Sequence, residues 1–297
     1  MIFFSYLIIF FFITNIQAED DNKPPKLDLR NFNGTINSSP FDFSSIIPDT
    51  QNQKSIRILD SQIDEIKLYS NEFKPEPIDS NDIIFMHTNY GLLKYSFYFE
   101  ESPKTCLNFK KLSNSRFYDK TLFHYIIPNF VIQGGDILTR NSDENDDGQG
   151  GPGWVIDAED NELNHKFGTL SMVRTPTDPN SAGSQFFISL SENKNLDGKY
   201  TIFGYLIEGK HVLPRISNVL SENGQAKLLC NTKIPTNENL KDWVKLWDPI
   251  TESNLYSKIQ GNIDKEEYKK IMQVRLNNMF RPAIPIIIDS IRVENEK

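Results

Sequence analysis

Short runs of apolar residues, separated by polar and glycine-containing turns, fill the middle of the chain. Residues 83–88 and 92–99 are two such runs, and the Asn-Tyr-Gly turn between them predicts a β-hairpin. Further runs with the length and composition of strands are 122–126, 131–134, 199–206 and 284–288. Many short strands, few helices and frequent glycine turns predict a mainly β fold, a closed antiparallel barrel capped by helices.

A helical pattern follows the hairpin. Ser102 and Pro103 have the residue types of a helix start, with a capping serine and a proline at the first helical position. The helix that begins here places Cys106, Phe109 and Leu112 on one face, and we expect this face to be buried.

A second helical pattern begins at residues 264–267. Their sequence, Asp-Lys-Glu-Glu, fits a capping box with aspartate in the capping position. The apolar residues of the helix share one face. They are Tyr268, Ile271, Met272, Leu276 and Met279. We expect this face to pack on the barrel, with presentation to a partner as the alternative.

The N-terminal part of the chain differs from the rest. Residues 1–18 are mostly apolar but shorter than the about 20 residues of a membrane span, so we predict a cleaved signal peptide, with a retained anchor as the alternative. Residues 19–81 are rich in Asp, Asn, Ser and Pro, which predicts a mostly disordered linker. It carries glycosylation sequons at Asn33 and Asn37, and the patterned stretch 55–69 could dock as a short helix or strand. We therefore expect a secreted or secretory-lumen protein without a membrane span after cleavage.

Charge and composition narrow the classes of function. The net charge of -8 disfavours nucleic-acid binding, which depends on clustered Lys and Arg. Cys106 and Cys230 do not make a disulfide framework, although one bridge between them is possible in an oxidising compartment. The four histidines are dispersed and lack the spacing of metal ligands. No metal or cofactor is expected.

An acidic and glycine-rich loop imitates two known motifs. Residues 148–153 match the glycine pattern of dinucleotide-binding loops, but they follow an acidic loop instead of a strand, which predicts a surface loop. The segment that starts at Asp143 imitates a calcium-binding loop. Its twelfth position is Trp154 instead of glutamate, so a solvated acidic turn is expected.

Three strings carry a more specific signal, namely residues 123–136, 183–188 and 196–204, which read FHYIIPNFVIQGGD, GSQFFI and LDGKYTIFG. In this order and spacing they resemble the cyclophilin family of peptidyl-prolyl isomerases. The resemblance covers roughly residues 83–216 and a final strand near Ile286, about half of the chain. Residues 172–175 are similar to the bacterial-type branch of the family.

The resemblance implies a fold, domain limits and an activity. The fold would be an eight-stranded barrel with one helix closing each end, the second at 213–220. The domain would span 82–297, with 221–283 as an insertion that the family core lacks. The activity would be cis–trans isomerisation of X–Pro bonds in proline-containing peptides or proteins, without cofactor, and we expect a monomer.

The resemblance also implies a substrate groove. Its catalytic positions would be Tyr125, Gln133 and Phe130, and its substrate-binding positions His124, Val131, Arg174, Gln185, Phe187, Leu196 and Tyr200. Such a groove needs no nucleophile, because a barrier of about 18–20 kcal/mol to amide rotation falls when the twisted amide is bound better than the planar one. A core of aromatic residues would explain the phenylalanines alone, but not the paired amides Gln133 and Gln185.

One position departs from the family. An arginine commonly follows the Phe-His pair, and here it is Tyr125, whose phenol offers one O–H where a guanidinium has a fork of donors. Loss of one such donor typically costs on the order of 10²–10³ in rate. Asn195 and Tyr200 also stand where tryptophan and histidine are common. We predict weakened isomerase activity, with Arg174 or Arg140 as possible substitutes, and a catalytically inactive proline-binding module as the alternative.

Overall fold

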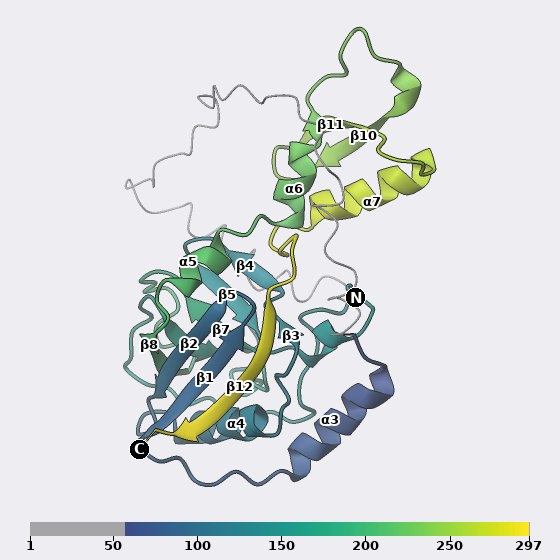
Figure 1. The fold of residues 1–297 in the computed structure, drawn as a ribbon. Helices are drawn as coiled ribbons and strands as arrows, with labels where there is room; N and C mark the ends of the chain where they lie inside the picture. Colours follow the sequence, from purple (N-terminus) through teal and green to yellow (C-terminus); the bar gives the residue numbers. More distant parts are fainter. Residues whose placement is uncertain (1–56, 297) are drawn as a thin grey trace.

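The computed structural model describes residues 57–296, and its largest element is one curled antiparallel sheet (Figure 1). Its nine strands follow the order β3-β12-β1-β2-β8-β6-β7-β5-β4. They are β1 (Asp82–Thr88), β2 (Gly91–Phe97), β3 (Thr121–Leu122), β4 (Tyr125–Ile127), β5 (Val131–Gly134), β6 (Thr169–Met172), β7 (Phe186–Ser189), β8 (Ile202–Glu208) and β12 (Ile287–Asn295). Leu122 bridges Asp136, just after β5, so the two ends of the sheet meet there. The predicted mainly β, barrel-like fold is confirmed, with nine strands where eight were expected.

The predicted hairpin is β1 and β2, joined at Thr88 and Gly91. The Thr88 hydroxyl donates to the Gly91 carbonyl, and Gly91 has a φ of 135°, which a residue with a side chain rarely adopts. The other edge of β1 pairs with β12. The strand predicted at 284–288 begins later, at Ile287, because Pro285 has no N–H to donate to a ladder, and it continues well past the predicted end.

The main core lies between the sheet and helix α4 (Pro103–Asn114), as predicted. Cys106, Phe109 and Leu112 are fully buried, and the Phe109 ring contacts Phe186 and Phe203 at centroid distances of 5.5 and 4.9 Å. Burying each large apolar side chain contributes about 1.5–3 kcal/mol, so this helix contributes strongly to the stability of the sheet.

Residues 60–72 correct the prediction of a disordered linker over 19–81. They form helix α3 (Asp60–Glu72), whose Ile63 is buried in the main core and whose Ser70 accepts a hydrogen bond from Ser115. The patterned stretch anticipated as a possible docked element is therefore a docked helix, because its apolar positions recur at helical spacing. Residues 19–56, with the two sequons, and the predicted signal peptide lie outside the described residues.

The insertion predicted at 221–283 forms a separate lobe beside the barrel (Figure 1). Its elements are α6 (Glu222–Leu228), β9 (Cys230–Asn231), η4 (Leu240–Asp242), β10 (Trp243–Asp248), β11 (Ser253–Lys258) and α7 (Lys265–Asn277). The strands form a small sheet in the order β10-β11-β9. The barrel side carries in addition η3 (Ile137–Arg140) and α5 (Val212–Ser217), the latter close to the second helix predicted at 213–220.

Helix α7 does not pack on the barrel, which corrects our expectation. Tyr268, Met272 and Leu276 are buried in a second core that belongs to the lobe and includes Val244 and Leu246 of β10. The small sheet supplies an apolar face closer than the barrel, and its strands were not apparent from the sequence. The predicted helix start is confirmed, because the Asp264 carboxylate accepts hydrogen bonds from two backbone N–H groups of the first turn.

The two segments that connect the lobe to the barrel run side by side. Ser221 bridges Pro282, and the Ala283 N–H donates to the Leu220 carbonyl at 2.8 Å. The returning segment also reaches the barrel, where the Ile126 N–H donates to the Phe280 carbonyl at 2.9 Å. The insertion therefore ends against β4, the last strand of the sheet.

Candidate functional site

Three side chains from neighbouring strands form a row on the outer face of the sheet. In the antiparallel register Tyr125 of β4 lies opposite Gln133 of β5, and Gln133 lies opposite Phe187 of β7. Residues directly opposite each other in an antiparallel sheet share a face. The neighbouring row, which includes Ile126 and Ile132, points into the main core. Tyr125, Gln133 and Phe187 consequently face away from the core together.

A cluster of apolar side chains, the candidate pocket, lies at the Phe187 end of this row. Its buried members are Val131, Phe187 and Leu196, each about 4–5% exposed, so they offer an apolar contact surface to a small ring. The partly buried rim consists of Phe130, Val173 and Tyr200. The Tyr200 ring meets Phe187 edge-on, with centroids 5.4 Å apart.

His165 supports the pocket from beneath and was missed from the sequence. Its ring stacks on Phe187 at a centroid distance of 5.7 Å and an interplanar angle of 11°. Nδ1 of His165 lies 2.9 Å from a carboxylate oxygen of Asp197, which fixes the orientation of the ring. Burial lowers the pKa of His165, and Asp197 opposes this effect. The histidine comes from the long loop between the recognisable strings, where no motif marks it.

The two predicted amides form a hydrogen-bonded pair. Nε2 of Gln133 donates to Oε1 of Gln185 at 2.9 Å, and Nε2 of Gln185 donates to the carbonyls of Gly148 and Gly150, both at 2.9 Å. Gln185 therefore holds Gln133 and the glycine loop in place. Oε1 of Gln133 has no hydrogen-bond donor among the described residues, and Gln133 as a whole is half-buried. This oxygen can accept from a peptide N–H.

The glycine loop 148–153 is organised around one buried carboxylate. Asp136 accepts hydrogen bonds from the N–H groups of Leu138, Gly148 and Gly150. Burial raises the pKa of Asp136, and the backbone donors oppose this effect. A Cβ at Gly150 would collide with the Asp136 carboxylate, so glycine is required there. The loop supports the site and does not open a helix as a dinucleotide-binding loop would, which agrees with the prediction.

Tyr125 contacts the insertion. Its ring lies against Phe280 with centroids 5.0 Å apart and an interplanar angle of 43°. Both rings are half-buried. The position where the family commonly has an arginine is thus part of an aromatic pair, and the second ring comes from the insertion.

The two arginines considered as substitutes lie elsewhere. The Arg174 guanidinium sits 5.1 Å from the Tyr200 ring centre and donates to the backbone carbonyls of Lys199 and Thr175. It borders the apolar cluster at Tyr200, and its two hydrogen-bond acceptors are backbone carbonyls beside that residue and beside Arg174 itself. Arg140 belongs to η3, where its pKa is lowered by burial, and it is not among the residues of the pocket.

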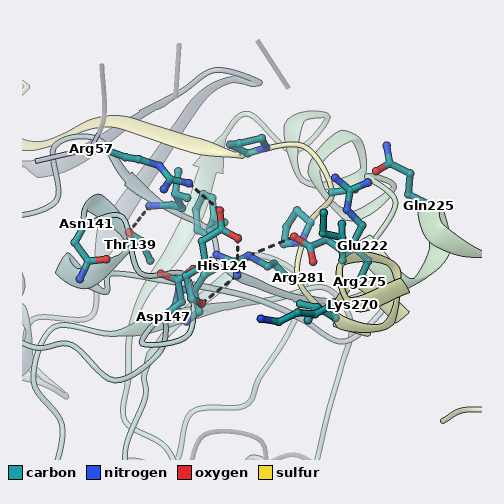
Figure 2. Close-up of a pocket in the computed structure, with 18 of the residues that line it drawn as sticks. Arg57, His124, Thr139, Asn141, Asp147, Glu222, Gln225, Lys270, Arg275 and Arg281 are labelled. Carbon is teal, nitrogen blue, oxygen red and sulfur yellow. Dashed lines mark hydrogen bonds and ion pairs between the residues drawn. The ribbon is translucent and has the colours of Figure 1, made fainter. Parts of the chain in front are cut away.

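His124 is not part of the groove, which corrects its predicted place among the substrate-binding residues. It precedes Tyr125 by one residue in an extended segment and therefore points to the opposite side. There it lines a cavity of about 530 Å³ between the barrel and the lobe, together with Asp147, Glu222 and Arg281 (Figure 2). Neither ring nitrogen meets a partner with hydrogen-bond geometry in the described part of the chain. Burial lowers the pKa of His124 to about 4, and Arg281 adds to this effect.

The charged walls of this cavity are largely paired. Arg281 forms ion pairs with Asp147, with Glu144 at 3.4 Å and with Glu222 at 3.7 Å. Burial raises the pKa of Asp147 to about 7, although Arg281 acts in the opposite direction. The acidic turn that imitated a calcium-binding loop thus gives two of its carboxylates, those of Glu144 and Asp147, to an arginine.

Residues 57–296 contain no cluster of three or more His, Cys, Asp or Glu side chains placed to hold a metal ion. Cys106 and Cys230 are both free thiols, and burial raises the pKa of each. None of the helices in this range has the length and apolar composition required to cross a bilayer.

The fold is thus a curled antiparallel sheet with an apolar cluster and an amide pair on its outer face. The sequence model of the family described as cyclophilin type peptidyl-prolyl cis-trans isomerase matches residues 83–238, and the chain belongs to this family. A peptidyl-prolyl cis-trans isomerase of Arabidopsis thaliana is 36% identical over 152 residues, which cover 50% of this chain and 87% of the relative. Human peptidyl-prolyl cis-trans isomerase-like 1 is 35% identical over 156 residues, covering 51% of this chain and 88% of the relative.

A solved structure from Cryptosporidium parvum is also similar. It is a cyclophilin type peptidyl-prolyl cis-trans isomerase crystallised in the presence of the dipeptide Ala-Pro. The similarity has a TM-score of 0.49 at 30% identity, and it covers 72% of this chain and 99% of the solved one.

Proposed function

We propose that this protein isomerises X–Pro bonds as a monomer in the secretory pathway, with lower turnover than a cyclophilin that has arginine at the position of Tyr125. The observation that supports isomerisation is the juxtaposition of the Val131–Phe187–Leu196 pocket with the amide oxygen of Gln133 on one face. The secretory location is supported by the apolar composition of residues 1–18.

The groove can favour a twisted amide without covalent chemistry. A prolyl ring fits the apolar pocket, where dispersion and the removal of apolar area from water hold it. Oε1 of Gln133 accepts from a flanking peptide N–H and so fixes the backbone on one side of the bond. With the ring and one flank fixed, the remaining free motion is rotation about the X–Pro bond, whose barrier of about 18–20 kcal/mol falls when the twisted form is bound best.

The reduced turnover follows from the chemistry of Tyr125. A neutral phenol O–H polarises an amide less than a charged guanidinium, since charge-assisted hydrogen bonds are roughly twice as strong as neutral ones. The same position favours a second candidate function, a proline-binding module without turnover, because the Tyr125 ring is packed against Phe280.

A protease-coupled prolyl-peptide assay on the purified protein tests the activity. We expect measurable turnover in the wild type, an increase of about tenfold or more in Tyr125→Arg, and a loss in Gln133→Ala. Wild-type turnover equal to that of Tyr125→Arg would contradict the proposed reduction. Peptide binding without turnover in the wild type would favour the binding module, and Phe187→Ala should then abolish the binding.

The location and the oligomeric state have separate tests. Expression in a eukaryotic secretory system should give a protein whose electrophoretic mobility changes on glycosidase treatment, through the sequons at Asn33 and Asn37. Mutation of both asparagines to glutamine should remove that change. A cytosolic product without sugar would contradict the location, and a mass above that of one chain in solution would contradict the monomer.

A further inference from the structure

The insertion supplies a side chain to the outer face of the barrel. Phe280 is fixed twice, by the hydrogen bond from the Ile126 N–H to its carbonyl at 2.9 Å and by the ring contact with Tyr125 at 5.0 Å. β4 is the last strand of the sheet, so the returning segment occupies an edge that would otherwise be open. Phe280 is therefore held where the row of Tyr125, Gln133 and Phe187 ends.

The length of this row matches a short stretch of extended peptide. Tyr125 and Phe187 are separated by β5, which is two strand spacings of about 4.8 Å each, or about 10 Å in all. An extended peptide advances about 3.3 Å per residue, so about three residues cover the same distance. A peptide with its proline ring on Phe187 and its backbone on Gln133 thus brings a residue two or three positions away to Tyr125 and Phe280.

The wall that this residue meets is the aromatic pair of Tyr125 and Phe280. Both residues are half-buried, so part of each side chain remains accessible to a ligand. Arg281 follows Phe280 directly, but it is shared among the carboxylates of Asp147, Glu144 and Glu222. An acidic ligand side chain would gain little here, whereas an aromatic one would gain a ring contact.

We propose that Phe280 is a specificity-determining residue that, with Tyr125, selects prolyl segments with an aromatic or large apolar side chain two or three residues from the proline. This inference depends on the proposed function, because it assumes that the prolyl ring occupies the pocket at Phe187. It assigns a role to the insertion: the lobe completes the substrate groove at the position where the family commonly has a cation.

The test compares peptides that differ only at the selected position. Peptides with Phe or Gly two or three residues before or after proline are titrated against the wild type and Phe280→Ala, with affinity measured by calorimetry. We expect the wild type to prefer one Phe peptide over its Gly counterpart by about three- to tenfold, and Phe280→Ala to lose this preference while its affinity for the Gly peptide changes less than about twofold. Phe280→Tyr, which keeps the ring, should retain the preference.

A matched control lies on the same returning segment. Ile284 is 47% exposed and is not part of the groove row, so Ile284→Ala should leave the preference unchanged. Thermal unfolding of each variant shows whether the fold is intact, and Phe280→Leu provides a second variant if Phe280→Ala is unstable. The inference would be overturned if the wild type bound the Phe and Gly peptides with equal affinity. It would also be overturned if the variants lost the same factor of affinity for both peptides. Absence of turnover in the wild type would contradict the proposed isomerase activity and not this inference, because calorimetry measures the affinity ratio independently of turnover.

Discussion

Arg281 connects the insertion to the barrel through charge, and its removal is a sharp test of the structure. Its guanidinium pairs with Asp147 and Glu144 of the acidic loop and with Glu222 of α6. The side chains of Asp147 and Glu222 are 11% and 18% exposed, so water can only partly replace a lost partner. We expect Arg281→Met, which keeps most of the apolar volume, to destabilise the protein in a pH-dependent way.

The size of the effect follows from the pKa of Asp147. Burial raises this pKa to about 7, above the unfolded value of 3.8, so the stability contributed by Asp147 is full below that unfolded value and is lost as pH rises through about 7. Without Arg281 the pKa of Asp147 rises further, and one additional unit removes about 1 kcal/mol of stability at about pH 8. Loss of the pairs with Glu144 and Glu222 adds about 1 kcal/mol at about pH 8. Burial also raises the pKa of Glu222, so this second contribution becomes smaller as pH falls. The total is about 2 kcal/mol at about pH 8 and less than about 1 kcal/mol at about pH 5.5.

Urea unfolding at both pH values measures this difference. Arg275→Met is the matched control, because Arg275 lines the same cavity but forms no ion pair within residues 57–296. Asp147→Asn combined with Arg281→Met should reduce the pH dependence to the part that Glu222 contributes. Equal destabilisation at the two pH values, or an equal effect in the Arg275 control, would refute the reasoning.

Three other predictions concern the cavity, the lobe and the glycine loop. Because burial lowers the pKa of His124 to about 4, this group makes the protein less stable as pH falls from 6.5 to about 4, by about 3 kcal/mol in all; His124→Phe should flatten that part of the stability profile in urea titrations. Leu276→Ala in the second core should cost about 2–5 kcal/mol in thermal or urea unfolding, against less than about 0.5 kcal/mol for the exposed Leu228→Ala. Gln185→Leu removes the hydrogen bonds to Gly148 and Gly150, and should speed amide exchange in the loop and lower peptide affinity about tenfold, whereas retained protection would contradict its positioning role.

The barrel was predictable because its signals are local. Strand runs, the Thr88–Gly91 turn and the Ser102–Pro103 helix start each depend on residues that are neighbours in sequence. Tyr125, Gln133 and Phe187 were assigned to one groove because they belong to two of the strings that resemble the family. The pairing of β4 with β5 and of β5 with β7 places these three residues in one row.

The lobe and its contacts were not predictable in the same way. The apolar face of α7 was recognised, but its partner strands have mixed composition, with Lys245 exposed between the buried Val244 and Leu246. The contact between Tyr125 and Phe280 joins residues far apart in the chain, and no periodicity indicates it. Long-range side-chain contacts of this kind depend on the path of the insertion, which has no counterpart in the strings that identified the barrel.

The proposed loss of turnover depends on whether any cation replaces the missing guanidinium. Arg174 donates to backbone carbonyls beside Tyr200, and Arg281 is shared among three carboxylates, so in the described residues neither points a donor at the Tyr125 position. The phenol O–H of Tyr125 is one group that could polarise the substrate amide. Tyr125→Phe keeps the contact with Phe280 and removes only this group, so we expect turnover to fall by about tenfold or more while peptide affinity stays within about twofold. Unchanged turnover in this variant would show that binding in the pocket alone accounts for the rate.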